Sequence, residues 1–463
     1  MNNFKTSRWF HNFLREASIG NSNELLSEVR WLWWRVEGSD LSLPTTSLHL
    51  PNLSVLELSG SWNFTEDWEG RRSSFMTPKR LLVLDLTWCW GLRRTPDLSA
   101  FTQLKILTLR HCEGLEHLHP SIGKLKSLVS LDLSLCGSLK ELPEEVGGLK
   151  DVLDKSGITE IPTSIGSLRK LKKLSAYRCK SLREIPSSIG DLQNLQFLDV
   201  SYSRLEKLPN AIGDLSSLQR LELRRCHKLR SLPRLSSLIH LEKLRLLECY
   251  LLEDIPELPS RLLKLSVWEC HKLILLKLDG LKNLETFSIK GCSSIERLDL
   301  SQLIRLKRLC AEHCYNLVEI QGLENLELLE GISINYCDSI ERLLCPKSGC
   351  LKKLVAAWCK NLVEIRGLDG AKFLEALTVM GWVSMETLPD LNGCEKLRSL
   401  NLRNWRKLTQ LRGLEKLDLI DLDISGCDSL EAIPKLSGTC VFRNYERKLS
   451  YDSWSDDSST ESD

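Results

Sequence analysis

Several features that mark other classes of protein are scarce or missing in this sequence. No window approaches the roughly 18 consecutive apolar residues of a membrane span, and no apolar stretch of signal-peptide length follows residues 1–20. Aromatic residues make up only 6% of the chain, while hydrophobic residues reach 42%, leucine foremost. We therefore expect a soluble intracellular protein, in the cytoplasm or also in the nucleus. Its leucine-rich core suits many similar layers better than one irregular core.

An excess of charge of either sign is also lacking. The chain has 63 basic and 61 acidic residues, which gives a net charge of +2. This balance provides no general attraction to nucleic acid or to an anionic membrane surface. We therefore expect no nucleic-acid partner and no membrane span, and any electrostatic preference has to come from a local patch.

Motifs of catalysis and cofactor binding are missing as well. The sequence contains no recognisable nucleophile–base constellation, no H-E-x-x-H and no glycine-rich dinucleotide loop. The nearest approach to a phosphate-binding loop is Gly123-Lys124, but Leu125 replaces the required Ser/Thr and Leu118 replaces the first glycine. The sequence therefore predicts a protein that is not an enzyme and that carries no cofactor.

One pattern recurs along nearly the whole chain, L-x-x-L-x-L-x-x-C-x-x-L. A clear copy has leucines at 104, 107, 109 and 115 around Cys112, and the copies follow one another mostly every 21 to 24 residues. A period in this range with this spacing is typical of leucine-rich repeats. The alternating L-x-L segment predicts a short strand that buries its apolar face only against neighbouring copies. We therefore expect an α/β solenoid, a leucine-rich-repeat horseshoe with a parallel β-sheet on the concave face and irregular or short helical turns on the convex side.

Three segments follow from the extent of the repeat. Residues 1–28 carry no clear repeat, and residues 29–434 form an array of about 18 repeats. Residues 435–463 form a tail whose last part, from Ser450, has five acidic residues and no basic one. Because this acidic part cannot bury apolar area, we expect the tail of residues 435–463 to be disordered. A solubilising role is favoured over a docking or phosphorylation segment.

Most of the 17 cysteines occupy one position of the repeat, directly after the predicted strand, here named the ladder position. A small thiol fits a buried site there and can donate a weak hydrogen bond to a backbone carbonyl of the turn. Such a column of reduced thiols agrees with an intracellular location. The cysteines at the ladder position are Cys89, Cys112, Cys136, Cys179, Cys226, Cys249, Cys270, Cys292, Cys314, Cys337, Cys359 and Cys427.

Two cysteine patterns raise the alternative of a metal site. Four ladder cysteines have a histidine next to them, as in His111–Cys112 and Cys270–His271. A ladder cysteine should point inward and its neighbour outward, so we do not expect the two to share an ion. Cys345 and Cys350 could form a loop disulfide or a metal clip, but free thiols are favoured because no second pair lies nearby.

The C-x-x-L-x-x-L-P form of the repeat resembles the leucine-rich-repeat region of plant intracellular immune receptors of the class with a Toll/interleukin-1-receptor-like domain and a nucleotide-binding domain upstream. The stretch 128–143, which reads LVSLDLSLCGSLKELP, carries this resemblance, as does the lead-in 26–34, LSEVRWLWW. The resemblance covers about residues 26–434. It implies a recognition module in plant innate immunity, with a pathogen effector or a guarded host protein as ligand. It also implies packing against a nucleotide-binding domain in cis or in trans.

The sequence departs from that receptor class because it contains neither the Toll-like domain nor the nucleotide-binding domain. A stand-alone scaffold or adaptor is therefore a second interpretation. An extracellular receptor ectodomain is a third, but the missing signal peptide, the buried free cysteines and only two glycosylation sequons, at Asn52 and Asn63, speak against it.

The two residues before each ladder position, together with neighbouring strand positions, are expected to project from the concave side. Aromatic and arginine side chains dominate binding hot spots, and they are frequent in these slots. Between Leu171 and Leu246 they form a basic, tyrosine-containing patch that suits an acidic surface on a protein. The predicted partner-binding residues are Trp88, Arg110, His111, Tyr177, Arg178, Tyr202, Arg224, Arg225, Arg245, Trp268, Tyr336 and Trp358.

Overall fold

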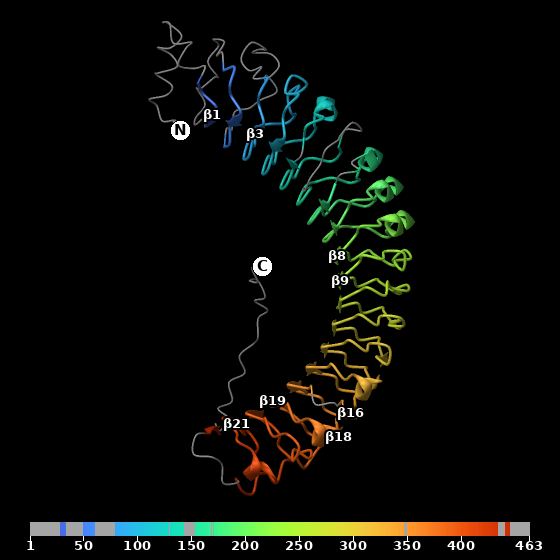
Figure 1. Cartoon of the computed structure of the whole chain (residues 1–463), viewed down its shortest axis with the longest axis vertical. Helices are drawn as coiled ribbons and strands as arrows, with labels where there is room; N and C mark the ends of the chain where they lie inside the picture. Colours follow the sequence, from blue (N-terminus) through green and yellow to red (C-terminus); the bar gives the residue numbers. More distant parts are fainter. Residues whose placement is uncertain are drawn as a thin grey trace. The chain divides into compact units, whose positions relative to one another are not determined.

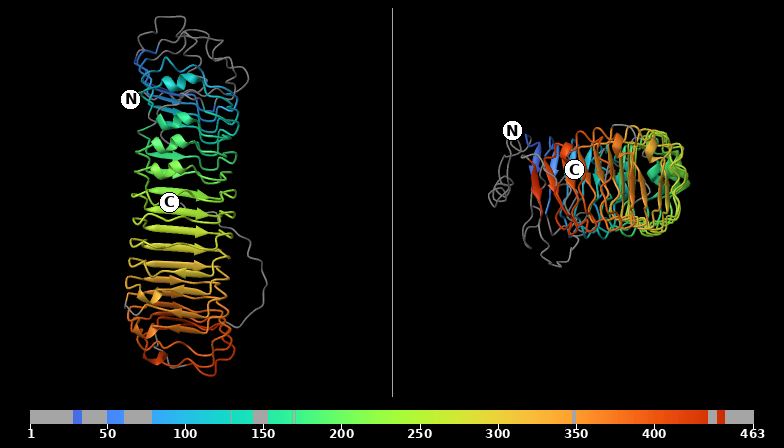
Figure 2. Two further views of the ribbon diagram at one scale, coloured as in Figure 1. Left: turned by 90° about the vertical axis from the view of Figure 1, so that its right-hand side faces the viewer. Right: turned by 90° about the horizontal axis from the view of Figure 1, so that it is seen from below.

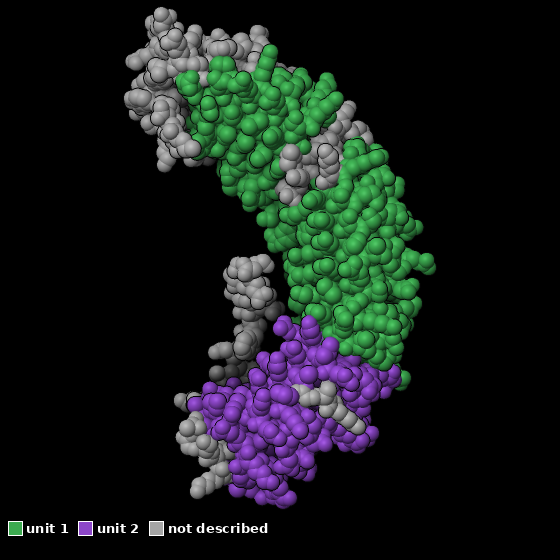
Figure 3. Space-filling model, viewed as in Figure 1, with its two compact units in different colours: residues 1–306 green, residues 307–463 purple. Residues whose placement is uncertain are grey.

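The computed structural model describes residues 28–33, 50–60, 79–128, 130–142, 153–167, 169, 171–346, 350–433 and 440–444. The chain divides into two compact units, residues 1–306 and 307–463 (Figure 3). The predicted lead-in before Glu28 and the acidic stretch from Ser450 lie outside the described residues.

Unit 1 is a stack of coils that each contribute one short strand to a parallel sheet (Figures 1 and 2). Between β5 and β6, a coil without an assigned strand maintains the backbone pairing, since Leu153 N–H donates to the carbonyl of Ser175 at 2.7 Å. The strands of this unit are β1 (Trp31–Trp33), β2 (Val55–Glu57), β3 (Val83–Asp85), β4 (Ile106–Thr108), β5 (Ser130–Asp132), β6 (Lys173–Ser175), β7 (Phe197–Asp199), β8 (Arg220–Arg224), β9 (Lys243–Leu247), β10 (Lys264–Trp268), β11 (Thr286–Lys290) and β12 (Arg297–Asp299).

Unit 2 repeats this construction. Strands β13, β15, β17, β19, β20, β21 and β22 pair in that order, all parallel, and β16 pairs with β18 in a second row. The strands are β13 (Arg308–Glu312), β14 (Glu319–Gln321), β15 (Gly331–Ser333), β16 (Arg342–Leu344), β17 (Lys353–Val355), β18 (Glu364–Arg366), β19 (Ala376–Thr378), β20 (Ser399–Asn401), β21 (Asp421–Asp423) and β22 (Val441–Arg443).

The strands of the sheets pair without any shift of register. Leu56 pairs with Leu84 and Leu84 with Leu107, and all three side chains are buried. A slip by one residue would turn every leucine of a strand to the open face, so burial of the L-x-L pattern fixes the register. The core is consequently a set of leucine columns that run along each stack.

The return segments form short 3-10 helices in several coils. In unit 1 the Pro-x-x-Ile-Gly stretches begin η4 (Ser187–Asp191) and η5 (Asn210–Asp214) directly after a proline in extended backbone, as proline's fixed φ favours. These turns lie on the side of unit 1 opposite to the strands (Figure 1). The other 3-10 helices are η2 (Pro120–Lys124), η3 (Thr163–Ser167), η6 (Leu323–Asn325), η7 (Leu368–Gly370) and η8 (Leu414–Lys416).

The prediction of a leucine-rich-repeat solenoid with parallel strands and short helical turns is confirmed. Within the described ranges every helix is of the 3-10 type, so the helical share is smaller than the α/β label implies. The array also extends past its predicted end at residue 434, because β22 pairs with β21 through Val441 and Phe442. The leucine spacing stops before β22, which the sequence pattern therefore did not reveal.

Eleven of the twelve ladder cysteines are buried, whereas Cys427 is half-buried, and within each unit they form a column as expected. Their thiols donate mainly to a backbone carbonyl of the preceding coil rather than only within their own turn. Cys112 Sγ lies 3.1 Å from the carbonyl oxygen of Leu86, and Cys249 Sγ lies 3.0 Å from that of Leu223. Cys112 and Cys249 therefore each join two coils.

Among the described residues, other hydrogen-bonding side chains replace cysteine at four ladder positions. Trp382 and Trp405 are fully buried there, and Trp382 Nε1 donates to the carbonyl of Ala356 at 2.6 Å. Ser156 and Ser203 complete the set, each within hydrogen-bonding distance of the cysteine of the next coil. The position therefore accepts a buried side chain that hydrogen-bonds to a neighbouring coil, not a cysteine as such.

Leu223→Asp should unfold the coils around β8. Leu223 is fully buried in the strand, and the substitution removes about 1.5–3 kcal/mol of apolar burial and adds an unpaired buried charge. The expected result is a loss of circular dichroism signal and a melting temperature lowered by many degrees. Leu275→Asp is the matched control, because Leu275 is 56% exposed and should tolerate the change. Normal spectra and melting for Leu223→Asp would contradict the assigned core.

The thiol column should make the fold sensitive to alkali. Burial raises the pKa of Cys136 to about 12 and those of Cys179 and Cys359 to about 11, from 9.0. Unfolded thiols ionise from about pH 9, so stability is complete below that pH and falls up to about pH 11–12, by roughly 1.4 kcal/mol per pH unit for each thiol. Urea unfolding at pH 7 to 11 measures this loss. In Cys136→Ser the free energy of unfolding should fall less steeply with pH. An unchanged slope would argue against a raised pKa of Cys136.

Candidate functional site

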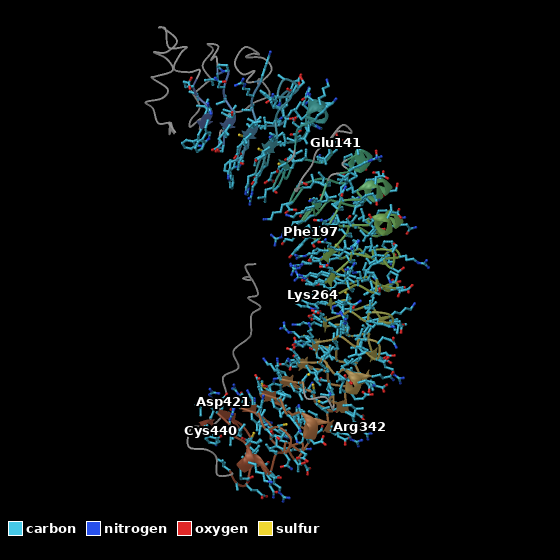
Figure 4. All side chains as sticks on the ribbon, viewed as in Figure 1. Glu141, Phe197, Lys264, Arg342, Asp421 and Cys440 are labelled. Atoms are coloured by element: carbon cyan, nitrogen blue, oxygen red, sulfur yellow. The ribbon has the colours of Figure 1, made fainter. Side chains whose placement is uncertain are left out.

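The open face of the sheet in unit 1 carries most of the predicted partner-binding patch. Because the strands pair in register, equivalent residues of successive coils stand side by side. The first row across β6 to β10 consists of Lys173, Phe197, Arg220, Lys243 and Lys264. Phe197 and Lys264 are labelled on the strand side of the unit in Figure 4. We name this row, together with Arg224 and Arg245, the basic face.

Cations and an aromatic ring are interleaved in the first row. The Phe197 ring has Lys173 Nζ 5.6 Å from its centroid and the Arg220 guanidinium 5.2 Å from it. Contacts of this kind orient the charged groups at a modest gain of about 0.5–1 kcal/mol each at exposed sites. The basic face is therefore an ordered surface rather than a set of independent flexible side chains.

A buried carboxylate lies at the centre of the basic face. Glu222 is only 1% exposed, and its carboxylate accepts hydrogen bonds from Nε of Arg220 and from Nε of Arg224, the latter at 3.1 Å. A terminal nitrogen of Arg245 lies 3.7 Å away. Glu222 is covered by arginines whose side chains remain 29–39% exposed, so the surface presents the cations.

The positive charge is dense enough to affect proton binding. Burial lowers the pKa of Lys243 to about 8, and the neighbouring Arg245 and Arg220 charges lower it further, against a smaller opposing effect of Glu222. Burial, opposed by Glu222, also lowers the pKa of Arg245. The basic face thus has a surplus of positive charge that its own carboxylate does not neutralise.

The residue directly before each ladder position has a left-handed backbone. All thirteen non-glycine residues with positive φ in the described ranges occupy this position, with φ between 53° and 65°. We name this set the left-handed column. Seven of the predicted partner-binding residues belong to it: Trp88, His111, Arg178, Tyr202, Arg225, Tyr336 and Trp358.

Side chains of the left-handed column stack on one another between coils. The Trp88 and His111 rings are parallel with centroids 3.7 Å apart. Further along unit 1, Tyr202 lies between Arg178 and Arg225, whose guanidinium carbons are 5.0 and 5.3 Å from its centroid. The stacks give the rim of unit 1 an ordered aromatic and cationic surface.

Unit 2 has a stack of its own in the same column. His313 and Tyr336 are 4.5 Å apart, and Tyr336 and Trp358 are 6.2 Å apart, all nearly parallel. Gly381 follows in the column, and a Cβ there would come within 2.2 Å of the Trp358 ring. The indole covers Gly381, so the stack requires glycine at this point.

The other predicted residues lie beside this column or within a strand. Arg224 and Arg245 bind Glu222 as described. Trp268 ends β10, where its Nε1 donates to Ser288 Oγ at 2.8 Å and Lys290 lies over its ring at 4.8 Å. Tyr177 meets Tyr202 edge to face at 5.1 Å. Arg110 is exposed next to His111, and its charge adds to burial in lowering the pKa of His111.

The structure groups the predicted residues into three places. Trp88, Arg110 and His111 lie in early coils of unit 1, whereas Tyr336 and Trp358 belong to unit 2. The remaining seven surround or form the basic face on the coils of β6 to β10. This largest group comprises Tyr177, Arg178, Tyr202, Arg224, Arg225, Arg245 and Trp268.

Sequence reasoning missed a second ring stack in unit 1. His227, Tyr250 and His271 follow successive ladder cysteines, with ring centroids 4.8 and 5.5 Å apart. From the sequence, His227 and His271 were considered only as neighbours of a cysteine in a possible metal site. The regular recurrence of a ring after the cysteine was the available signal. His313 and Glu248, which binds Arg225 at 2.8 Å, were missed in the left-handed column.

Neither a metal cluster nor a membrane helix is found in the part of the chain that the structure describes. No group of three or more His, Cys, Asp or Glu side chains there is arranged to hold a metal ion. Among the same residues, no helix has the length and apolar character needed to cross a membrane.

Glycine substitutions can separate backbone strain from stacking in the left-handed column. Lys155→Gly should stabilise unit 1 by about 0.5–1 kcal/mol, because Lys155 is exposed and its positive φ is strained for any residue with a Cβ. Tyr202→Gly relieves the same strain but removes both arginine–ring contacts, worth about 1–2 kcal/mol together. Chemical denaturation should therefore show Tyr202→Gly as the less stable variant. Equal gains in both would mean that the stack contributes nothing.

Comparison with known proteins matches part of the chain to a family. Residues 152–273 match the family model described as a leucine-rich repeat region. The chain is 31% identical over 150 residues to Protein SUPPRESSOR OF npr1-1, CONSTITUTIVE 1 of Arabidopsis thaliana, which covers 31% of this chain and 9% of that protein. It is 39% identical over 60 residues to TMV resistance protein N of Nicotiana glutinosa, which covers 13% of this chain and 5% of that protein.

Solved structures with low identity are also similar. A leucine-rich-repeat protein of Leptospira interrogans is 20% identical with a TM-score of 0.46, covering 79% of this chain and 93% of that chain. The functional domain of InlJ from Listeria monocytogenes is 18% identical with a TM-score of 0.47, covering 74% and 70%. The aligned regions span less than a tenth of either curated relative. The chain thus contains a leucine-rich-repeat region and has weak, partial homology to plant resistance proteins.

Proposed function

We propose that unit 1 binds a protein partner through the basic face and the adjoining stacks of the left-handed column. The observation that carries this proposal is the ordered, half-exposed set of arginines and tyrosines around β6 to β10. Arginine, tyrosine and tryptophan are the residues most enriched at binding hot spots. The stacks and the Glu222 contacts hold them in place before binding, which lowers the entropy lost on association.

The biological role proposed for this surface is recognition in plant innate immunity. The partner would be a pathogen effector or a host protein that an effector modifies, in the cytoplasm or the nucleus. The weak homology to plant resistance proteins supports this role. A nucleotide-binding domain, in cis or in trans, is proposed as a second partner on the same grounds. The surplus positive charge of the basic face favours an acidic surface on the effector or host protein.

The test compares the proteins that wild-type and variant chains retain. Trp268→Ala and Arg225→Ala should retain the fold but bind the partner with at least ~10-fold lower affinity, since both side chains lie on the proposed interface. Tagged full-length chains are expressed in plant leaves with and without a pathogen, and co-purified proteins are quantified by mass spectrometry. Binding of a captured protein is then measured with purified components.

Ile274→Ala is the matched control, because Ile274 is 72% exposed but lies outside the strands. It should leave binding unchanged. If Trp268→Ala and Arg225→Ala retain every partner with unaltered affinity, the surface formed by the basic face and its adjoining side chains is not the interface. If the partners are the same with and without the pathogen and include no immune component, a scaffold role replaces immune recognition.

A further inference from the structure

The basic face concentrates positive charge at one place. On the strand positions of β7 to β10, five basic side chains accompany two carboxylates, Asp199 and Glu222. Arg220, Lys243 and Lys264 are direct neighbours in one row, an arrangement of like charges that destabilises a sheet. An anion bound above this row would remove the repulsion.

The two carboxylates do little to offset these cations at the surface. Glu222 is buried beneath the arginines. Asp199 is half-buried, and its carboxylate accepts the backbone N–H of Ser201 at 2.9 Å; burial raises the pKa of this carboxyl, against the opposing hydrogen bonds from Ser201. Glu222 acts as an anchor: by accepting Nε–H of Arg220 and of Arg224, it fixes the guanidiniums from below. Each arginine has five N–H donors, and these two contacts use one donor in each.

We propose that Arg220, Lys243 and Arg245, held around Glu222, bind a phosphate monoester carried on a side chain of the partner protein. This inference rests on the proposed function, because it names the group on the partner that the basic face recognises. Clusters of arginine are a recurrent means of recognising phosphorylated segments. A planar guanidinium matches phosphate oxygens with paired hydrogen bonds, which a lysine or an amide cannot do.

A phosphate fits this site better than the carboxylates of an acidic segment. A phosphate monoester places about −1.5 to −2 charges and three acceptor oxygens in one group at pH 7. Carboxylates on an extended chain distribute single charges about 3.3 Å apart along its length. Arg220 and Lys243 are cross-strand neighbours on β8 and β9, and Arg245 stands opposite Glu222, so the N–H donors that Glu222 does not use lie close together in one place. Phe197 on β7 and Trp268 on β10 lie on either side and can pack against the side chain that carries the phosphate.

Titration calorimetry on the full chain tests the ligand class. The probes are N-acetyl-O-phosphoserine amide, N-acetylaspartate amide as the carboxylate control, and inorganic phosphate as the free source. The phosphoserine probe should bind at least ~10-fold more tightly than the aspartate probe. Its affinity should also exceed that of inorganic phosphate, which has no side chain to pack on Phe197. Equal affinity for the aspartate probe overturns the phosphate assignment, and equal affinity for inorganic phosphate overturns its protein-borne source.

Variants locate the site. Arg245→Gln should weaken phosphoserine binding by ~10-fold or more, since it removes a charge-assisted hydrogen bond. Arg230→Gln is the matched control, because Arg230 lies outside the strands, is 61% exposed and pairs with Glu253. It should bind like the wild type. Thermal melting of both variants confirms that they fold. Undiminished binding by a folded Arg245→Gln chain would overturn the proposal.

The pH dependence of phosphoserine binding shows whether Lys243 contacts the ligand, because a lysine with only a structural role would not change this profile. The charged groups that face Lys243 are Arg220 and Glu222 on β8, Arg245 on β9 and Lys264 on β10. Affinity should rise through about pH 6 as the phosphate loses its second proton, and fall above about pH 8 as Lys243 becomes neutral. Lys243→Gln should bind more weakly and lose the fall above pH 8. A profile identical to that of the wild type would exclude Lys243 from the site.

Failure of this inference and failure of the proposed function have different outcomes. A captured partner that remains bound after phosphatase treatment, and that binds Arg245→Gln as tightly as the wild type, would refute the phosphate site and leave the protein interface standing. Specific phosphoserine binding together with no partner sensitive to Trp268→Ala would refute the interface and leave the site. Release of the partner by phosphatase and by Arg245→Gln alike would support both.

Discussion

The in-register stacking of coils is the constraint on which the rest of the structure depends. One coil exposes the leucines of its short strand, and only an identical neighbour in the same register can cover them. Each position of the repeat therefore becomes a column, with leucines in the core, thiols at the turn and left-handed residues at the rim. The thiol column reinforces the register, since Cys112 and Cys249 bond to the preceding coil and a shifted coil would leave these buried groups unpaired.

The same constraint determines how the surface can be used. A charge on one strand lies about 4.8 Å from the equivalent position of the next, so like residues in successive repeats repel and rings in successive repeats stack. Tyr202 between Arg178 and Arg225 shows the favourable case. Arg220 beside Lys243 shows the unfavourable one, which the buried Glu222 moderates. A surface of this kind can maintain a concentrated charge because the leucine and thiol columns beneath it supply the stability.

Much of this architecture could be predicted from the sequence because the repeat makes each inference many times over. The L-x-L spacing located the strands, and the recurring cysteine located the buried turn. The left-handed column could not be found in this way, since tryptophan, histidine, arginine and tyrosine occupy a conformation that usually favours glycine. Nor could the burial of Glu222, because it depends on how Arg220 and Arg224 fold over it. The strand β22 was not predicted, because Val441 and Phe442 pair with β21 without any leucine pattern.

Strand length links the fold to the proposed site. In unit 1 the strands have five residues in β8, β9, β10 and β11, and three in the others. Because alternate residues face the same side, two further residues of open strand add a third row of side chains to the two that a three-residue strand already presents. Glu222 stands in the second row of β8, with Arg220 in the first row and Arg224 in the third. A carboxylate held by an arginine on each side along its own strand therefore needs a strand of this length. The basic face is therefore where the regular repeat provides the widest rigid platform, the support that a preorganised binding site needs.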